Sequence, residues 1–114
     1  MRKDGEIMMS AELTRETLTP LVVETLEDIC RDQDLPIVVA VDAETVLFGE
    51  GGLLDSLGLV TLIVELEQRI EDRFGVRVAL ADERALSERR SPYRTVGSLA
   101  DYAALRAREN RRDG

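Results

Sequence analysis

The sequence predicts an all-α domain, and three observations lead to that class. Apolar residues recur every three or four positions in three separate segments, the pattern of helices that each bury one face. The chain has 114 residues, a usual length for one compact domain. Apolar residues make up 44% of the chain and aromatic residues only 4%, so the core must be small and aliphatic.

The first helical pattern begins near residues 17–20. Thr19 followed by Pro20 predicts an N-cap and a first helical residue, because proline fits the first turn of a helix. Cys30 closes the apolar stripe and is expected to be a small buried residue, since the chain has no histidine to activate its thiol. Residues 1–16 lack periodicity and are expected to form a flexible extension. The stripe consists of Leu18, Leu21, Val22, Leu26 and Ile29.

Residues 31–54 are expected to form a long connection between helices. Connections of this length are uncommon in compact domains and usually have a function. Within it, residues 37–41 are rich in β-branched side chains and are a candidate short strand. Gly49, Gly51 and Gly52 gather near its end. The segment lacks the Gly-Lys-Ser/Thr of a P-loop, and its aspartates lack the spacing of an EF-hand, so it predicts neither a nucleotide site nor a calcium site.

The second helix is the clearest element and is predicted over residues 56–74, ending at Gly75. A second apolar strip, formed by Leu57, Val60 and Val64, repeats along its flank among acidic residues. Two interpretations are open: a wider contact with the core, or a docking face for a partner with basic and apolar groups. The core-facing stripe consists of Leu59, Leu62, Ile63, Leu66, Ile70 and Phe74.

The last third is predicted to contain a connector, a short helical piece and a third long helix. Residues 76–80 are expected to be extended with alternate side chains inward, and residues 82–87 to form one or two helical turns. Thr95 is expected to cap the third helix, and the polar residues 107–114 to fray. The inward face of that helix consists of Val96, Leu99, Ala100, Ala103 and Tyr102.

Composition excludes the catalytic and metal chemistry that needs histidine or several cysteines. Without histidine there is no Ser-His-Asp or Cys-His catalysis, and a single cysteine excludes a disulfide framework or a four-cysteine metal site. The net charge of −8 argues against nucleic acid or an anionic membrane as the partner. The charged N-terminus, and the lack of an apolar run near the roughly 20 residues of a membrane span, predict a cytoplasmic protein.

The charge is uneven along the chain. Residues 1–83 contain 7 basic and 19 acidic residues, a net charge of −12, whereas residues 84–114 contain 8 basic and 4 acidic residues, a net charge of +4. The acidic part includes the second predicted helix. It therefore predicts partners with basic surfaces, while the basic end has the ordinary interpretation of a solvated surface.

Asp55 and Ser56 carry the strongest chemical signal. A glycine-rich approach brings Ser56 to the first turn of a long helix, where unpaired N–H groups and the helix dipole favour a negative charge such as a phosphate ester. Asp55 would cap the helix or help to hold a metal ion during phosphoryl transfer. The simpler alternative is that both residues only cap the helix. A hydrolase nucleophile of the usual kind is excluded, because there is no histidine and no Gly-x-Ser-x-Gly.

These residues resemble those of acyl and peptidyl carrier proteins, whose signature is Asp-Ser-Leu. The resemblance covers roughly residues 17–106 and implies a bundle of three long helices and one short helix with a long first loop. It also implies a freestanding monomer that is not an enzyme. The similar segments are the loop before the signature, Leu54-Asp55-Ser56-Leu57, Glu65-Leu66-Glu67, Phe74-Gly75-Val76, Thr95-Val96 and Leu99-Ala100-Asp101-Tyr102.

The resemblance implies a function as well as a fold. A phosphopantetheinyl transferase would attach 4′-phosphopantetheine from coenzyme A to Ser56, beside Asp55, and the thiol of this arm would carry an acyl or aminoacyl group as a thioester. An acyl- or aminoacyl-loading ligase would supply the group, and acyl-transfer or synthase enzymes would receive it. The residues that match the family's partner contacts are Leu57, Val60, Val64 and Glu67.

Several positions depart from the family's pattern. Gly58, Thr61 and Gln68 stand where carriers of fatty acid synthesis commonly have acidic residues. This difference favours a specialised lipid, polyketide, nonribosomal or aminoacyl-transfer pathway. Glycine costs a helix about 1 kcal/mol relative to alanine, so Gly58 indicates a purpose other than stability. Residues 82–94 resemble an insertion around the short helix.

Two other functions are weighed against the carrier. The first is a helical interaction module that docks partners and never receives the arm. The second is a small enzyme using Glu65 and Glu67, which is disfavoured because residues two apart on a helix point in different directions.

Overall fold

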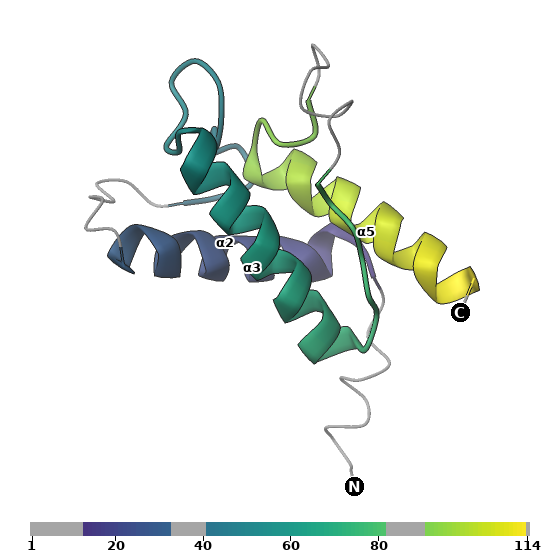
Figure 1. Cartoon of the computed structure of the whole chain (residues 1–114). Helices are drawn as coiled ribbons and strands as arrows, with labels where there is room; N and C mark the ends of the chain where they lie inside the picture. Colours follow the sequence, from purple (N-terminus) through teal and green to yellow (C-terminus); the bar gives the residue numbers. More distant parts are fainter. Residues whose placement is uncertain (1–12, 33–40, 82–90, 114) are drawn as a thin grey trace, which may run out of the picture.

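The computed structural model of the chain describes residues 13–32, 41–81 and 91–113. The elements formed by these residues are the helices α2 (Arg15–Asp32), α3 (Ser56–Phe74) and α5 (Val96–Asp113). No strand occurs in the described ranges, so the all-α class is confirmed for them. α2 packs against both other helices, as Figure 1 shows. None of the three helices is long and apolar enough to cross a membrane.

Some sequence predictions lie outside the described residues. They include the short helical piece expected at residues 82–87, and with it the fourth helix that the resemblance implies. The candidate strand at residues 37–41 is outside them too, except for Val41, which has no regular secondary structure. The described part therefore establishes three long helices.

α2 begins at Arg15, so the predicted cap at Thr19 is wrong. Two threonines start the helix earlier. The N–H of Thr17 donates to Thr14 Oγ1 at 3.2 Å, and the N–H of Thr14 donates to Thr17 Oγ1 at 3.0 Å, which is the reciprocal arrangement of a capping box. Pro20 lies inside the helix at an exposed position, where water can replace the N–H donor that proline lacks.

The core is aliphatic, as the composition predicts, and each helix contributes one face to it. The stripes predicted on α2 and α3 are buried, apart from the partly buried Phe74, and Cys30 is buried as expected. Leu13 and Tyr93, which precede α2 and α5, are also almost completely buried, although the helical patterns do not include them. Among the largest fully buried side chains are Tyr93, Leu13, Leu18, Leu26, Leu47, Leu59, Leu62, Leu66, Ile70, Leu80 and Leu99.

α3 has the bounds that the sequence predicts because both of its ends are capped locally. The Asp55 carboxylate accepts the N–H of Gly58 at 2.8 Å, and the Asp55 carbonyl accepts the N–H of Leu59 at 2.9 Å. Gly75 adopts a left-handed conformation with φ +69°, and its N–H donates to the carbonyl of Glu71. Glycine reaches this conformation at the least cost, so the helix ends there.

α5 begins as predicted, with Thr95 as its cap. The N–H of Ser98 donates to Thr95 Oγ1, and the N–H of Thr95 donates to Ser98 Oγ, both at 3.0 Å. The inward residues predicted for this helix are buried, with Tyr102 partly so. The helix continues to Asp113, and Ala107 is buried, so helical structure extends into the stretch expected to fray.

The loop before α3 is held by its backbone. Leu47 is fully buried, its N–H donates to the carbonyl of Arg94 at 2.6 Å, and its carbonyl accepts the N–H of Leu54 at 2.8 Å. Val46 forms an isolated antiparallel bridge with Thr95. The loop therefore connects the start of α3 to the start of α5, although nearly fifty residues separate Leu47 from Arg94.

α2 and α3 are also joined by ion pairs. Arg69 of α3 donates to the Asp28 carboxylate of α2 at 2.9 Å, and Arg73 pairs with Glu24 at 3.0 Å. Arg31 donates to Asp28 from within α2, also at 2.9 Å. These hydrogen bonds, with the one from Arg69 the largest cause, hold the pKa of Asp28 below its ordinary value of 3.8.

This depressed pKa predicts a pH dependence of stability. The contribution of ionised Asp28 is complete above its unfolded-state pKa and is lost as the pH falls through the lower folded-state pKa. We expect Asp28→Asn to lower the free energy of unfolding at neutral pH, and to have a progressively smaller effect as the pH falls below 3.8. Urea denaturation over a pH series measures this difference, with the exposed Asp72→Asn as control. A difference that is constant with pH would contradict it.

Candidate functional site

Ser56 is the first residue of α3 and is exposed. It lies at the positive end of the helix dipole, beside first-turn N–H groups that have no acceptor within the helix. Asp55 is exposed as well, but its carboxylate turns back to the N–H of Gly58. Asp55 is therefore an N-cap in this structure, which is the simpler of its two predicted roles.

Gly58 leaves little space for a side chain. It is buried in the first turn, and a Cβ at this position would lie 3.2 Å from Leu54 Cδ2 and 3.3 Å from Asp55 Oδ1. Both distances are tighter than ordinary van der Waals contacts. The absence of a side chain at Gly58 thus leaves room for the Asp55 cap, which accounts for a residue that lowers helix propensity.

Two kinds of glycine shape the loop that leads to Ser56. Gly49 and Gly51 have positive φ, at +97° and +77°, in a conformation that other residues adopt with strain. Gly52 has an ordinary φ but no space for a side chain, since a Cβ there would lie 2.7 Å from the carbonyl oxygen of Leu47. The glycines therefore permit both the turn and the close backbone approach that place Ser56.

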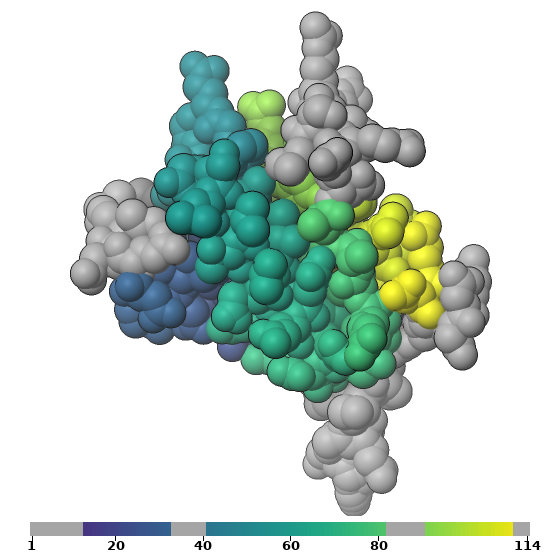
Figure 2. All heavy atoms as spheres, viewed as in Figure 1, coloured from purple at the N-terminus to yellow at the C-terminus, as the bar shows by residue number. Residues whose placement is uncertain are grey.

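The predicted second apolar strip of α3 is exposed. Leu57, Val60 and Val64, here called the α3 strip, are 73%, 51% and 52% exposed, and Leu53 in the preceding loop is 38% exposed. α3 lies across the face of the molecule that Figure 2 shows. A wider core contact would have buried these side chains. The structure therefore favours the docking interpretation of the strip.

The charged residues of α3 before Arg69 are all acidic. α3 has no lysine or arginine before Arg69, and both Arg69 and Arg73 are directed to the carboxylates of α2. The basic residues of this helix are thus engaged on the side away from the strip. The acidic residues of α3 and of the loop before it are Asp42, Glu44, Glu50, Asp55, Glu65, Glu67, Glu71 and Asp72.

Glu67, which the sequence assigns to partner contact, is engaged inside the molecule. Its Oε2 accepts the N–H of Leu80 at 2.7 Å, and the side chain is half-buried. Residues 76–81, here called the connector, are extended, with Val76, Val78 and Leu80 inward as predicted. Glu67 therefore holds the connector against α3.

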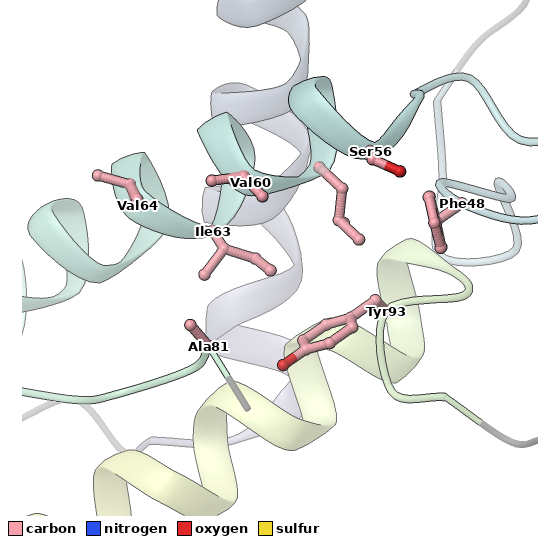
Figure 3. Close-up of a pocket in the computed structure, with 8 residues that line it drawn as sticks. Phe48, Ser56, Val60, Ile63, Val64, Ala81 and Tyr93 are labelled. Carbon is pink, nitrogen blue, oxygen red and sulfur yellow. The ribbon is translucent and has the colours of Figure 1, made fainter. Parts of the chain in front are cut away.

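An apolar cavity of about 130 Å³ opens beside Ser56 (Figure 3). Most of its lining comes from α3, with one side chain each from the loop, the connector and the segment before α5. The Tyr93 hydroxyl at its wall donates to the carbonyl of Leu80. The lining residues are Phe48, Ser56, Leu59, Val60, Ile63, Val64, Ala81 and Tyr93.

The sequence patterns predict Ser56 and the α3 strip but not the opposite wall of this cavity. Phe48, Ala81 and Tyr93 come from three segments without regular helical structure. One signal was available, because the chain has only two phenylalanines and two tyrosines. Aromatic residues in the loops of a chain with few aromatic residues indicate where those loops pack against the rest of the domain.

The remaining candidate groups take no part in this site. Burial is the main cause that raises the pKa of the Cys30 thiol, which agrees with its predicted role as a small core residue. Within the described ranges, no group of three or more histidine, cysteine, aspartate or glutamate side chains is arranged to hold a metal ion.

Comparisons of the chain with protein-family models, with curated proteins and with solved structures found no match in any of the three.

The loop geometry predicts an order of stability among glycine variants. We expect Gly51→Ala to cost about 1–2 kcal/mol, the strain of a left-handed alanine with open space around it. Gly52→Ala should cost more, because its Cβ overlaps the Leu47 backbone, which two hydrogen bonds hold in place. Urea denaturation of both variants gives the comparison. Equal stabilities, or the reverse order, would show that the loop is not held as described.

Proposed function

We propose that this chain is a freestanding carrier protein that holds an acyl group on a 4′-phosphopantetheine arm attached to Ser56. The observation that carries the proposal is an exposed serine in the first turn of a long helix, beside an apolar cavity and an exposed apolar strip. Ser56 lies in Leu54-Asp55-Ser56-Leu57, which resembles the signature of carrier proteins. This function requires no catalytic group from the chain itself, in agreement with its lack of histidine.

The surroundings of Ser56 fit a phosphodiester. In the transfer reaction, the Ser56 hydroxyl oxygen would attack the phosphorus next to the pantetheine of coenzyme A, and adenosine 3′,5′-bisphosphate would leave. The serine proton would pass to a base of the transferase. The first-turn N–H groups of α3 and its helix dipole would stabilise the negative phosphodiester. When attached, the arm supplies a thiol that carries the cargo as a thioester.

The α3 strip supports the partners expected of a carrier. Its apolar side chains are exposed on a helix that has no basic residue before Arg69, and Arg69 and Arg73 pair with α2, so a partner with basic and apolar groups would suit it. The transferase, the loading ligase and the acceptor enzymes would each dock here in turn. Attachment to the arm would raise the effective concentration of the cargo at every docked active site.

The attachment itself is tested by intact mass. Incubation with coenzyme A, magnesium and a broad-specificity phosphopantetheinyl transferase should add one phosphopantetheine to the wild-type chain and none to Ser56→Ala. Ser91→Ala, which changes a serine outside the site, should be modified like the wild type. No gain on the wild type, or an equal gain on Ser56→Ala, would overturn the carrier proposal. The α3 strip would then be better explained by the alternative function, a helical interaction module that docks partners without receiving the arm.

The docking face is tested by the rate of the same reaction. We expect Leu57→Glu to lower kcat/KM for the transferase by about tenfold, the effect of losing about 1.4 kcal/mol of interface energy. Leu105→Glu makes the same change on α5, where the leucine is 47% exposed, and should leave the rate unchanged. Circular dichroism verifies that both variants fold. Equal rates for the two variants would show that α3 is not the docking face.

A further inference from the structure

We propose that the cavity beside Ser56 selects a short apolar group of about six carbons, and that Tyr93 and the connector set this limit. The proposal depends on the proposed function only for the way in which the group reaches the cavity. It narrows the cargo from acyl groups in general to short, uncharged ones. The argument depends on the size of the cavity, its lining and the fixation of its wall.

The cavity has the size of a small hydrocarbon. Its volume is about 130 Å³. Engineered protein cavities of about 150 Å³ with an apolar lining stay dry and bind benzene, which has six carbon atoms. A chain much longer than this would have to leave its end in water or displace part of the wall. The volume therefore predicts an upper limit near six carbons.

The lining favours an uncharged group. Five of the side chains that form the cavity are Leu59, Val60, Ile63, Val64 and Ala81, all aliphatic. Ser56 stands at one end, and the Tyr93 hydroxyl is already committed to the carbonyl of Leu80. An ammonium or carboxylate placed among these aliphatic groups would lose its hydration without gaining a partner. The lining thus disfavours an aminoacyl group and favours an acyl chain.

The wall opposite α3 is held at one residue by two different elements. Leu80 donates its N–H to Glu67 of α3 at 2.7 Å, and its carbonyl accepts the hydroxyl of Tyr93. Leu80 is itself fully buried, and Ala81, the next residue, lines the cavity. The Tyr93 ring is buried as well and packs edge-to-face on Tyr102, with ring centroids 6.0 Å apart. The wall therefore resists expansion, which turns a small cavity into a selective one.

The experiment uses the whole chain loaded with a series of acyl groups. A broad-specificity transferase and acyl-coenzyme A donors attach chains of two to twelve carbons to Ser56. We expect the thermal midpoint to rise with chain length up to about six carbons and then to level off or fall. A midpoint that keeps rising to twelve carbons, or that does not depend on chain length, would overturn the proposal.

Two variants test the residues that set the limit. Ala81→Leu adds volume to the cavity from an exposed position and should move the optimum to a shorter chain, whereas Ala79→Leu changes an exposed connector alanine outside the lining and should not. Tyr93→Phe keeps the ring but removes the bond to Leu80 and should allow longer chains. If Tyr93→Phe does not fold, the comparison of the two alanine variants decides. The same optimum in Ala81→Leu and Ala79→Leu would contradict the assignment.

A measurement on the unmodified chain separates this inference from the carrier proposal. Benzene titrated into the wild-type protein should shift the methyl NMR signals of Ile63 and Val64 and leave those of Leu105 unchanged. It should not do so in Ala81→Leu. Benzene binding without any arm transfer would leave the cavity assigned and the carrier proposal rejected. Arm transfer without benzene binding and without a chain-length optimum would reject the cavity proposal alone.

Discussion

The backbone of Leu47 joins the first turn of α3 to the first turn of α5, and the candidate site depends on that connection. Its N–H and carbonyl reach Arg94 and Leu54, while its side chain is fully buried. Closing a loop of this length costs conformational entropy, which the buried hydrogen bonds and apolar contacts offset. One consequence is that Ser56 lies near Phe48 and Tyr93. A second is that an apolar cavity forms where a long loop alone would leave an open surface.

The ion pairs of α3 affect its surface more than its stability. Arg69 and Arg73 pair with α2, and partly exposed pairs of this kind contribute little free energy in water. Their larger effect is to direct the positive charge of α3 towards α2. The exposed apolar strip therefore has no basic side chain of α3 beside it.

Local signals predicted most of the helical structure. Asp55, Gly75 and Thr95 end or begin their helices as expected, because a cap depends on residues within about four positions of itself. The start of α2 was predicted wrongly because two local signals compete there. Pro20 favours a start near residue 19, but the reciprocal hydrogen bonds of Thr14 and Thr17 start the helix earlier. These bonds satisfy N–H groups at the helix start, whereas a proline supplies no acceptor for them.

The sequence by itself determined the three helices, their buried faces and the position of Ser56 in a first turn, since periodicity and capping act over a few neighbouring residues. Only the tertiary structure decided which apolar flank stays exposed, how Glu67 is used and where the cavity lies. Glu67 stands among acidic neighbours in sequence, but its partner is the N–H of Leu80, thirteen residues away. The cavity walls come from α3, the loop, the connector and the segment before α5, which meet only when the core packs. Such contacts depend on long-range packing, and no pattern within one segment encodes them.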